Sequence, residues 1–263
     1  MTLRAKAEQR IGDYCGAISC DSAAPGDSDT QVSRCARIAR WGVSSLHRVR
    51  RLSQRVAQNG LGSHEVAAPI LGEDKIAVGV VGGFGASMRG PGHVHHNGLE
   101  MIRFGALKSL PTQRLQASAK IWESSGFKVS LFEDVQRMVW EKLIMNVTFS
   151  GTTCATGLTI GEVMANPDAW SVALGCAKEA IAVAAAIGVK MDVGDPIEHI
   201  KTLGGKIPNA RPSMLLDYNA GRRGEVDAIN GSIPRLGKQY GVPTPVNETV
   251  VGIIKARQAG FPA

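Results

Sequence analysis

The stretch Val139-Trp-Glu-Lys-Leu-Ile-Met-Asn-Val-Thr-Phe-Ser150 is apolar at most positions, yet Lys142, Asn146 and Ser150 recur in it at intervals of four residues. Residues four apart share one face of a helix, so these polar side chains form a stripe. A lysine or an asparagine buried without a partner costs on the order of a few kcal/mol. The stripe therefore faces either bulk water, as in an ordinary amphipathic helix, or a polar cleft lined by an ammonium and an amide.

The chain has different hydrophobic patterns on the two sides of this stretch. Before it, apolar runs and turn residues predict strands at 75–81, 100–104 and 127–132 and a helix at 112–125. After it, nearly everything has the period of helices, with Gly188 and Gly241 among the residues that stand where helices should stop. The predicted helices span residues 135–150, 168–187, 196–203, 213–218, 225–240 and 248–258.

This layout is an α/β segment followed by an all-α segment, with the junction near Glu133. Such an arrangement usually means two domains, with a binding site in the cleft between the layers. Pro234 lies inside the helix predicted at 225–240 and should kink it, because proline supplies no backbone N–H.

The composition is that of a soluble globular protein, since 44% of the 263 residues are hydrophobic and 20% are charged. No stretch approaches the roughly 18 apolar residues of a membrane span, so we expect a cytoplasmic protein without membrane contact. Residues 1–55 hold 10 Lys and Arg against 5 Asp and Glu, but this excess is diffuse, which argues against nucleic-acid binding. Five cysteines without a CxxC pair predict free thiols and no metal site.

Residues 1–50 show neither sustained alternation nor a helical repeat. We expect this segment to be disordered or a non-native N-terminus. Elsewhere, two polar residues have structural explanations of their own: Ser213 can cap the helix predicted at 213–218, and Glu225 falls in the first turn of the next. The Gly-rich turn at 57–63 is either a simple turn or backbone that approaches a planar ligand ring, and nothing local decides between them.

Seven short motifs follow one another along the chain. They are Gln58-Asn-Gly-Leu-Gly62, Gly90-Pro-Gly-His-Val94, Trp140-Glu-Lys-Leu-Ile-Met-Asn146, Gly161-Glu162, Pro212-Ser-Met-Leu-Leu-Asp217, Glu225-Val-Asp-Ala-Ile-Asn-Gly231 and Gly241-Val-Pro-Thr-Pro-Val-Asn247. In this order, and from about residue 52 to the C-terminus, they resemble the ketopantoate reductases (2-dehydropantoate 2-reductases). Seven motifs in order are a stronger signal than any one of them.

The resemblance implies an incomplete Rossmann-like NADP-binding domain over residues 51–133. A helical catalytic and substrate domain of the 6-phosphogluconate dehydrogenase type would follow over residues 134–263. It further implies an oxidoreductase that passes a hydride from NADPH to the ketone of a small-molecule 2-oxo acid. In the family's case 2-dehydropantoate becomes pantoate, for pantothenate and coenzyme A biosynthesis. The alternative is a catalytically inactive, truncated homologue that acts only as a helical association module. A homodimer is compatible with either function.

By the same resemblance, Lys142 matches the catalytic lysine, and Glu225 matches the glutamate that orients this lysine and the bound ligands, the cofactor included. An ammonium suits this chemistry, because hydride transfer builds negative charge on the carbonyl oxygen. Desolvation would lower the pKa of the lysine, and a nearby carboxylate would oppose that change. Asn146 and Ser213 match substrate-binding positions, and Asn59 matches an asparagine near both nicotinamide and substrate.

The chain departs from the family's pattern at three places. Ser150 stands where a further asparagine is frequent, and it can still donate a hydrogen bond to substrate. Ile160 stands where another asparagine is usual and cannot donate, so another branched 2-oxo acid is an open alternative. The GxGxxG turn that receives the pyrophosphate is absent from residues 1–50. The nearest match, at 83–88, has Met88 in place of the third glycine, and we expect it to be a chance match.

Overall fold

The computed structural model of the protein describes residues 54–56, 59–82, 85–91, 93–98, 101–108 and 112–262. The expectations for residues 1–50, and for the cysteines among them, lie outside these described residues. The chain falls into two compact units, one of which includes residues 86–96 and the other residues 53–85 and 97–263.

The described part of the first unit is a two-stranded sheet of β3 (Gly85–Gly90) and β4 (His93–Gly98). The chance match at 83–88 ends inside β3, because its described residues 85–88 are extended. A phosphate-binding turn needs a helix that begins directly after the glycines. The described residues 85–88 of this motif therefore lack the helix that a phosphate-binding turn needs.

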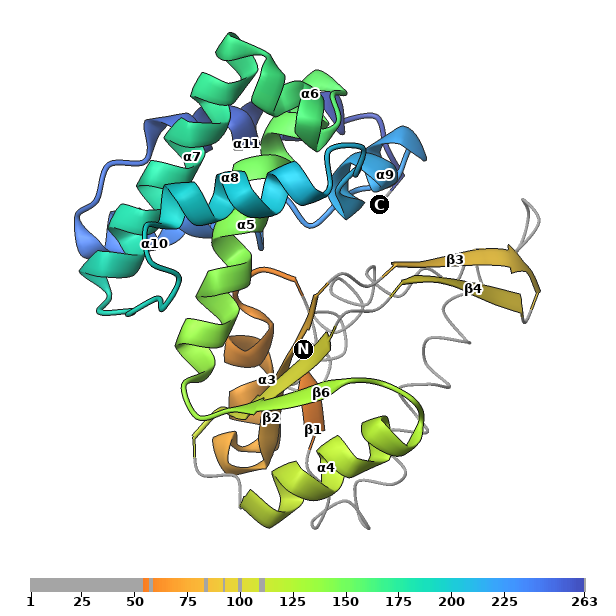
Figure 1. Ribbon diagram of the computed structural model, residues 1–263. Coiled ribbons are helices and arrows are strands. Elements are labelled where there is room, and N and C mark those ends of the chain that lie inside the picture. The colour runs from red at the N-terminus through yellow and green to blue at the C-terminus, as the bar shows by residue number, and fades with distance from the viewer. Residues whose placement is uncertain are drawn as a thin grey trace, which may run out of the picture. The chain divides into compact units, whose positions relative to one another are not determined.

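The second unit contains a four-stranded sheet with the strand order β1-β2-β5-β6 (Figure 1). Its strands are β1 (Gln54–Val56), β2 (Ile76–Gly82), β5 (Met101–Ala106) and β6 (Val129–Phe132). β1 and β2 run parallel, β2 and β5 antiparallel, and β5 and β6 parallel. The three strands predicted for this region are confirmed, and β1 was not predicted. β2 is buried from Ile76 to Val80, as expected for an apolar strand that is covered on both faces.

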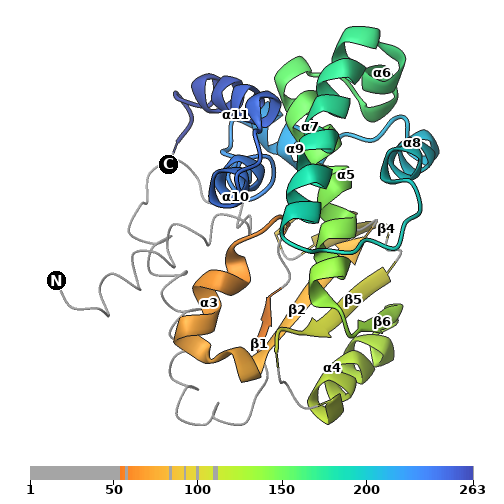
Figure 2. The ribbon, with the colours of Figure 1, turned by 90° about the vertical axis from the view of Figure 1, so that its left-hand side faces the viewer.

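Helices cover both faces of this sheet (Figures 1 and 2). On one face, Leu115 of α4 (Thr112–Ser124) shares a cluster with Ala77, Ile102 and Phe104. On the other face, Val80 shares a cluster with residues of α5 (Val135–Thr156), and α3 (Ser63–Leu71) adds partly buried alanines to it. The alternation of side chains along each strand separates the two clusters.

The helix α5 carries the predicted polar stripe and runs from the sheet into the helical bundle (Figure 1). It begins after Asp134, whose carboxylate accepts a hydrogen bond from the backbone N–H of Arg137. It ends at Gly157, which has the left-handed φ of 80° that favours glycine. The prediction for 135–150 was therefore right about the start and short at the end.

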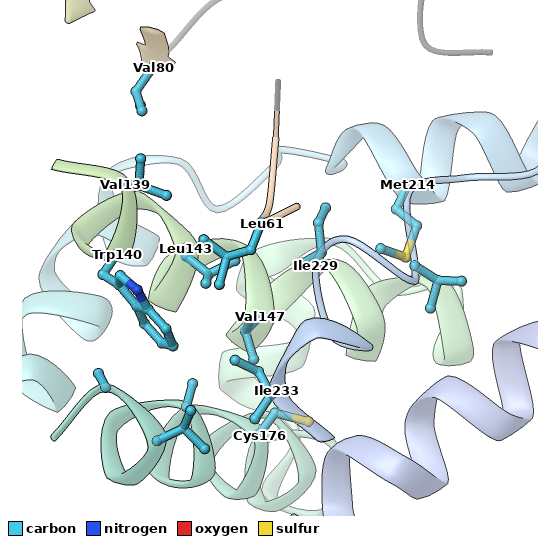
Figure 3. Packing of buried hydrophobic residues seen from close by; sticks show 14 of the residues in the cluster. Leu61, Val80, Val139, Trp140, Leu143, Val147, Cys176, Met214, Ile229 and Ile233 are labelled. Atoms are coloured by element: carbon cyan, nitrogen blue, oxygen red, sulfur yellow. The ribbon is translucent and has the colours of Figure 1, made fainter. Parts of the chain in front are cut away.

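The remaining helices form the bundle around α5. They are α6 (Ile160–Ala165), α7 (Pro167–Ala186), α8 (Pro196–Lys206), α9 (Ser213–Asn219), α10 (Ser232–Tyr240) and α11 (Pro245–Arg257). The side chains of Val147, Cys176 and Ile233 bring α5, α7 and α10 together in one cluster (Figure 3). By length and composition α7 could cross a membrane, but Glu179 in its middle accepts hydrogen bonds from α11, as suits a core helix.

Three predictions about local structure are wrong. Residues 225–231 form turns, and α10 begins only at Ser232, so Glu225 does not lie in a first helical turn. Pro234 is consequently the third residue of α10, where a backbone N–H has no partner within the helix, and the expected kink has no cause. Ser213 does not cap α9, because the capping position is Pro212 and no side chain caps this helix.

Candidate active site

Asn59 belongs to a turn that lies against the middle of the segment 225–231. Gly60 has a φ of +76°, and a side chain there would collide with the carbonyl of Ala228. The next residue, Leu61, donates its backbone N–H to the same carbonyl at 2.9 Å and buries its side chain. Asn59 therefore lies beside the 225–231 turn because glycine permits the close backbone approach.

Lys142 projects from α5 toward this turn. Its Nζ donates a hydrogen bond to Oδ1 of Asn59 at 2.7 Å and a second one to the backbone oxygen of Val81 at 2.7 Å. Val81 is the penultimate residue of β2, so the ammonium lies at the end of a central strand. The polar stripe of α5 thus faces other parts of the protein at Lys142, and the interpretation as a water-exposed stripe does not hold there.

Glu225 completes this arrangement from the far side of Asn59. Its Oε2 accepts a hydrogen bond from Nδ2 of Asn59 at 2.9 Å, while its backbone oxygen accepts from two later residues of the turn. The Asn59 amide thus joins the ammonium to the carboxylate, with its oxygen toward Lys142 and its nitrogen toward Glu225. We call these three residues the active-site cluster.

Desolvation shifts both charged members of the active-site cluster toward their neutral forms. It lowers the pKa of Lys142 to about 8; Glu225 opposes the shift and the nearby Arg103 adds to it. Desolvation likewise raises the pKa of Glu225, against the hydrogen bond from Asn59; the charge of Asp217 adds to the increase, and that of Lys142 opposes it. A lysine with a pKa near 8 can both hold and release a proton close to neutral pH.

The other predicted site residues lie apart from these hydrogen bonds. Asn146 is half-buried one turn along α5 from Lys142, and its amide makes no hydrogen bond to a described residue. Ser150, two turns along, is only 3% exposed and is part of the packed core. Ser213 is exposed as the first residue of α9. The structure thus joins Lys142, Asn59 and Glu225 and leaves the substrate-binding roles of Asn146, Ser150 and Ser213 as predictions.

Two members of this region were missed by the sequence reasoning. The backbone oxygen of Val81 gives no signal in a sequence, because every residue carries one. Arg103 did give a signal: it is a lone cation in the strand Met101–Ala106, whose buried residues are apolar or glycine. Its guanidinium lies over the ring of Phe132, 5.8 Å from the centroid.

Two hollows of the described surface lie elsewhere. One, of about 580 Å³, is lined by α10 and by the loop that leads from it into α11. The other, of about 530 Å³, is lined by His64 and other residues of α3 together with Leu107. Neither hollow is lined by a member of the active-site cluster. The cluster is therefore identified by its hydrogen bonds and not by a hollow of the surface.

The described residues fit one end of the nicotinamide cofactor that the resemblance implies. The amide of Asn59 and the ammonium of Lys142 are hydrogen-bonded to each other, and both groups suit the place where the nicotinamide ring would meet the carbonyl group of a substrate. The pyrophosphate end has no counterpart among the described residues, since β2 is followed by the hairpin β3–β4 and not by a helix. The fit is therefore to the reacting end of the cofactor.

Two family models match the chain. The model described as ketopantoate reductase PanE/ApbA covers residues 54–109, and that of the C-terminal part of ketopantoate reductase PanE/ApbA covers residues 134–258. The region between them contains α4 and β6. The two matches therefore include Asn59, Lys142 and Glu225.

Two relatives are named 2-dehydropantoate 2-reductase. The protein from Archaeoglobus fulgidus is 26% identical over 235 residues, which is 89% of this chain and 74% of the relative. The protein from Pyrobaculum aerophilum is 31% identical over 208 residues, which is 78% of this chain and 69% of the relative. The chain thus spans about seven tenths of each relative's length.

Solved structures share the fold. A PanE/ApbA family ketopantoate reductase from Ralstonia eutropha JMP134 is 28% identical with a TM-score of 0.70, over 78% of this chain and 66% of that one. A D-mandelate dehydrogenase in complex with NADH is 22% identical with a TM-score of 0.75, over 86% of this chain and 77% of that one. These likenesses agree with the predicted fold, a Rossmann-like segment followed by a helical one.

Proposed function

Because the chain belongs to the ketopantoate reductase family, we propose that it reduces the ketone of a 2-oxo acid with a nicotinamide cofactor. The observation that carries this proposal is the hydrogen-bonded series from Lys142 through Asn59 to Glu225. In this series an ammonium, an amide and a carboxylate that are far apart in sequence are hydrogen-bonded to one another, which supports a proton donor with two orienting groups.

The donor capacity of Lys142 supports its role as the proton source. An ammonium has three N–H donors, and two of them are used on Asn59 and Val81. The third is available for the carbonyl oxygen of a substrate. When bound, the reduced nicotinamide supplies the hydride that adds to the carbonyl carbon. Lys142 stabilises the charge that develops on oxygen, then gives up its proton to form the hydroxyl and becomes a neutral amine.

Asn59 and Glu225 act on this step by position. Asn59 fixes the direction of the ammonium, and its place at the reacting end would also bring it against the nicotinamide. Glu225 holds the Asn59 amide in one orientation and limits the fall in the Lys142 pKa. We assign Asn146, Ser150 and Ser213 to the hydroxyl groups or the carboxylate of the substrate. Ser213 is exposed and Asn146 is half-buried, so both are more accessible to a substrate than the buried Ser150.

We further propose 2-dehydropantoate as substrate and NADPH as cofactor, in a cytoplasmic protein. The names of the relatives support the substrate, and the NADH bound by D-mandelate dehydrogenase supports the cofactor class. Ile160 stands where the family usually has an asparagine and cannot donate a hydrogen bond, so another branched 2-oxo acid is the alternative substrate.

The test is a spectrophotometric assay of NADPH and NADH oxidation with 2-dehydropantoate and a panel of branched 2-oxo acids. We expect turnover by the wild-type chain and a loss of kcat of about 100-fold to 10,000-fold in Lys142→Ala. Lys178→Ala, on the exposed face of α7, is the matched control and should retain turnover. An inactive wild-type chain, folded and without cofactor affinity, would favour the association module.

A further inference from the structure

Arg103 faces α5 and not α4. Its neighbours along β5, Ile102 and Phe104, both belong to the cluster with α4, so Arg103 points to the opposite face of the sheet. The register agrees, because Arg103 pairs with Val80, and paired residues point to the same face. Val80 in turn belongs to the cluster with α5, as Figure 3 shows together with Val139.

The same register brings Arg103 close to the active-site cluster. The backbone oxygen that accepts from the Lys142 ammonium belongs to Val81, next to the residue that pairs with Arg103. The two cations are near enough for the charge of Arg103 to lower the pKa of Lys142. Two positive charges therefore lie at one end of the strand pair β2–β5.

Arg103 has no anionic partner in the part of the chain that the structure describes. Its described contact is the ring of Phe132, which satisfies none of its N–H donors. A guanidinium presents a planar fork of donors that matches a carboxylate in two parallel hydrogen bonds. The positive charges of Arg103 and Lys142 repel each other when no anion is bound. A bound anion would relieve this repulsion and accept hydrogen bonds from the guanidinium.

We propose that Arg103 binds the carboxylate of the 2-oxo acid while Lys142 contacts its ketone oxygen. The proposal rests on the proposed function and deepens it. In a 2-oxo acid the ketone and the carboxylate are on adjacent carbons, so two neighbouring cations match its two oxygen groups. Arg103 would thereby make the site select 2-oxo acids over simple ketones, aldehydes and amides, and Asn146 and Ser213 would be left for the rest of the substrate.

The first experiment compares 2-dehydropantoate with its amide, which has the same ketone but no carboxylate. In the wild-type chain, kcat/KM for the acid should exceed that for the amide about tenfold to a hundredfold. In Arg103→Gln the KM for the acid should rise by that factor with a smaller change in kcat, and the preference should vanish. Arg103→Lys should recover part of it. Arg114→Gln, on α4 across the sheet, is the control and should keep the preference.

The second experiment separates the carboxylate from the cofactor phosphates, the other source of negative charge. NADPH affinity, measured by fluorescence titration, should be the same in the wild type and in Arg103→Gln. A loss of NADPH affinity with an intact acid preference would overturn the proposal in favour of a phosphate. An acid preference that survives in Arg103→Gln and disappears in Ser213→Ala would overturn it in favour of α9.

The third experiment does not depend on turnover. Oxamate carries a carboxylate beside a carbonyl, and oxamide lacks the carboxylate. Calorimetry should find oxamate binding to the wild type, with binding weakened at least tenfold in Arg103→Gln, and oxamide binding to neither. A wild-type chain that binds oxamate but reduces no 2-oxo acid would contradict the proposed function and retain the role of Arg103. Oxamate binding that is equal in both chains would contradict the role of Arg103 alone.

Discussion

Two polar clusters inside the same compact unit use similar groups in opposite ways. The active-site cluster joins Lys142, Asn59 and Glu225. The second, which we call the bundle cluster, consists of Glu179, Asn247 and Asn230, whose amide donates a hydrogen bond to Oδ1 of Asn247 at 3.0 Å. In the bundle cluster the carboxylate of Glu179 accepts from the backbone N–H groups of Val246 and Asn247 and from the amide of Asn247 at 2.7–2.9 Å. Those backbone groups are the free donors at the start of α11, where the helix dipole favours an acid.

Under the proposed function, the difference separates groups that stabilise the fold from groups that are available to a ligand. The bundle cluster meets a charge with the free backbone donors of a helix end. The active-site cluster meets two charges with a neutral amide and a carbonyl, so that the pKa of Lys142 falls and that of Glu225 rises. We therefore expect changes in the bundle cluster to lower stability, and changes in the active-site cluster to lower activity while stability holds or increases.

The largest expected loss of stability follows the removal of the Glu179 carboxylate. Glu179→Ala leaves three buried or half-buried N–H donors without their acceptor, which should lower the free energy of unfolding by about 2–4 kcal/mol. Urea denaturation measures it, with the exposed Glu123→Ala on α4 as control. The comparison fails if Glu179→Ala is as stable as the control, or if its folded form loses turnover as completely as a Lys142 variant.

The next prediction concerns Lys142, whose removal or deprotonation should increase the stability of the fold. Lys142 has a pKa of about 8 in the folded chain against 10.5 ordinarily, so between these values the unfolded chain binds more protons. The contribution of Lys142 to the free energy of unfolding, taken as the wild type minus Lys142→Met, should therefore rise by about 2–3 kcal/mol from pH 8 to pH 10.5. The difference is needed because burial raises the pKa of the Cys154 and Cys176 thiols, which lowers stability above about pH 9 in both chains. Lys142→Met should be more stable than the wild type at pH 7. The same difference taken with Lys178→Met should not rise; if it does, some other group causes the rise.

A comparison of Gly60→Ala with Gly62→Ala separates the effect of backbone strain from the effect of a steric collision beside Asn59. A side chain at Gly60 meets the carbonyl of Ala228, whereas at Gly62, also with positive φ, it meets nothing within 4 Å. Gly60→Ala should cost about 1–3 kcal/mol and reduce kcat/KM at least tenfold, because Asn59 is displaced. Gly62→Ala should show a smaller cost and nearly normal kinetics. Equal kinetic losses in the two variants would show that the position of Asn59 does not matter.

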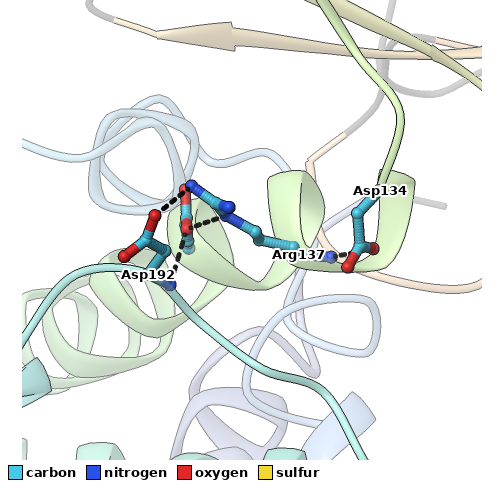
Figure 4. A network of polar contacts seen from close by, with 4 residues as sticks. Asp134, Arg137 and Asp192 are labelled. Carbon is cyan, nitrogen blue, oxygen red and sulfur yellow. Dashed lines mark hydrogen bonds and ion pairs between the residues drawn. The ribbon is translucent and has the colours of Figure 1, made fainter.

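The smallest effect is expected for a surface network at the start of α5. Arg137 contacts Glu141 at 2.9 Å and Asp192 at 2.9 Å (Figure 4). Pairs of this exposure contribute about 0–1 kcal/mol, so Asp192→Ala should lower the unfolding midpoint in urea only slightly and leave kcat/KM unchanged. A loss above about 2 kcal/mol would mean that the loop containing Asp192 supports α5 more than its exposure indicates.

The elements that local pattern controls could be predicted from the sequence. The strand β2 and the helix α5 have clear apolar patterns, and both begin within one residue of the predicted start, although α5 continues six residues beyond the predicted end. The segment 225–231 has a helical pattern but folds as turns. These turns contact the Asn59 turn through Ala228, and they contact α5 through the hydrogen bond from the Asn230 amide to the backbone oxygen of Val147. Local pattern contains no information about such long-range packing.

The active-site cluster could be named only through the resemblance to a family. Asn59 and Glu225 are 166 residues apart, and Lys142 and Asn59 are 83 apart. No spacing rule joins such positions, and each residue had a structural explanation of its own. The equal spacing of Lys142, Asn146 and Ser150 correctly placed them along one helix, but it did not indicate that Ser150 would be buried in the core.

The proposed role of Lys142 is tested most directly by an NMR titration of its ammonium group. The lysines are labelled at the ε carbon, and the Lys142 signal is assigned by its absence in Lys142→Arg. Lys142 should titrate with a pKa of about 8 and move closer to neutral pH when Glu225→Gln removes the opposing charge. A value near the ordinary 10.5, unchanged in Glu225→Gln, would mean that the ammonium is in open water and that no proton donor is poised beside Asn59.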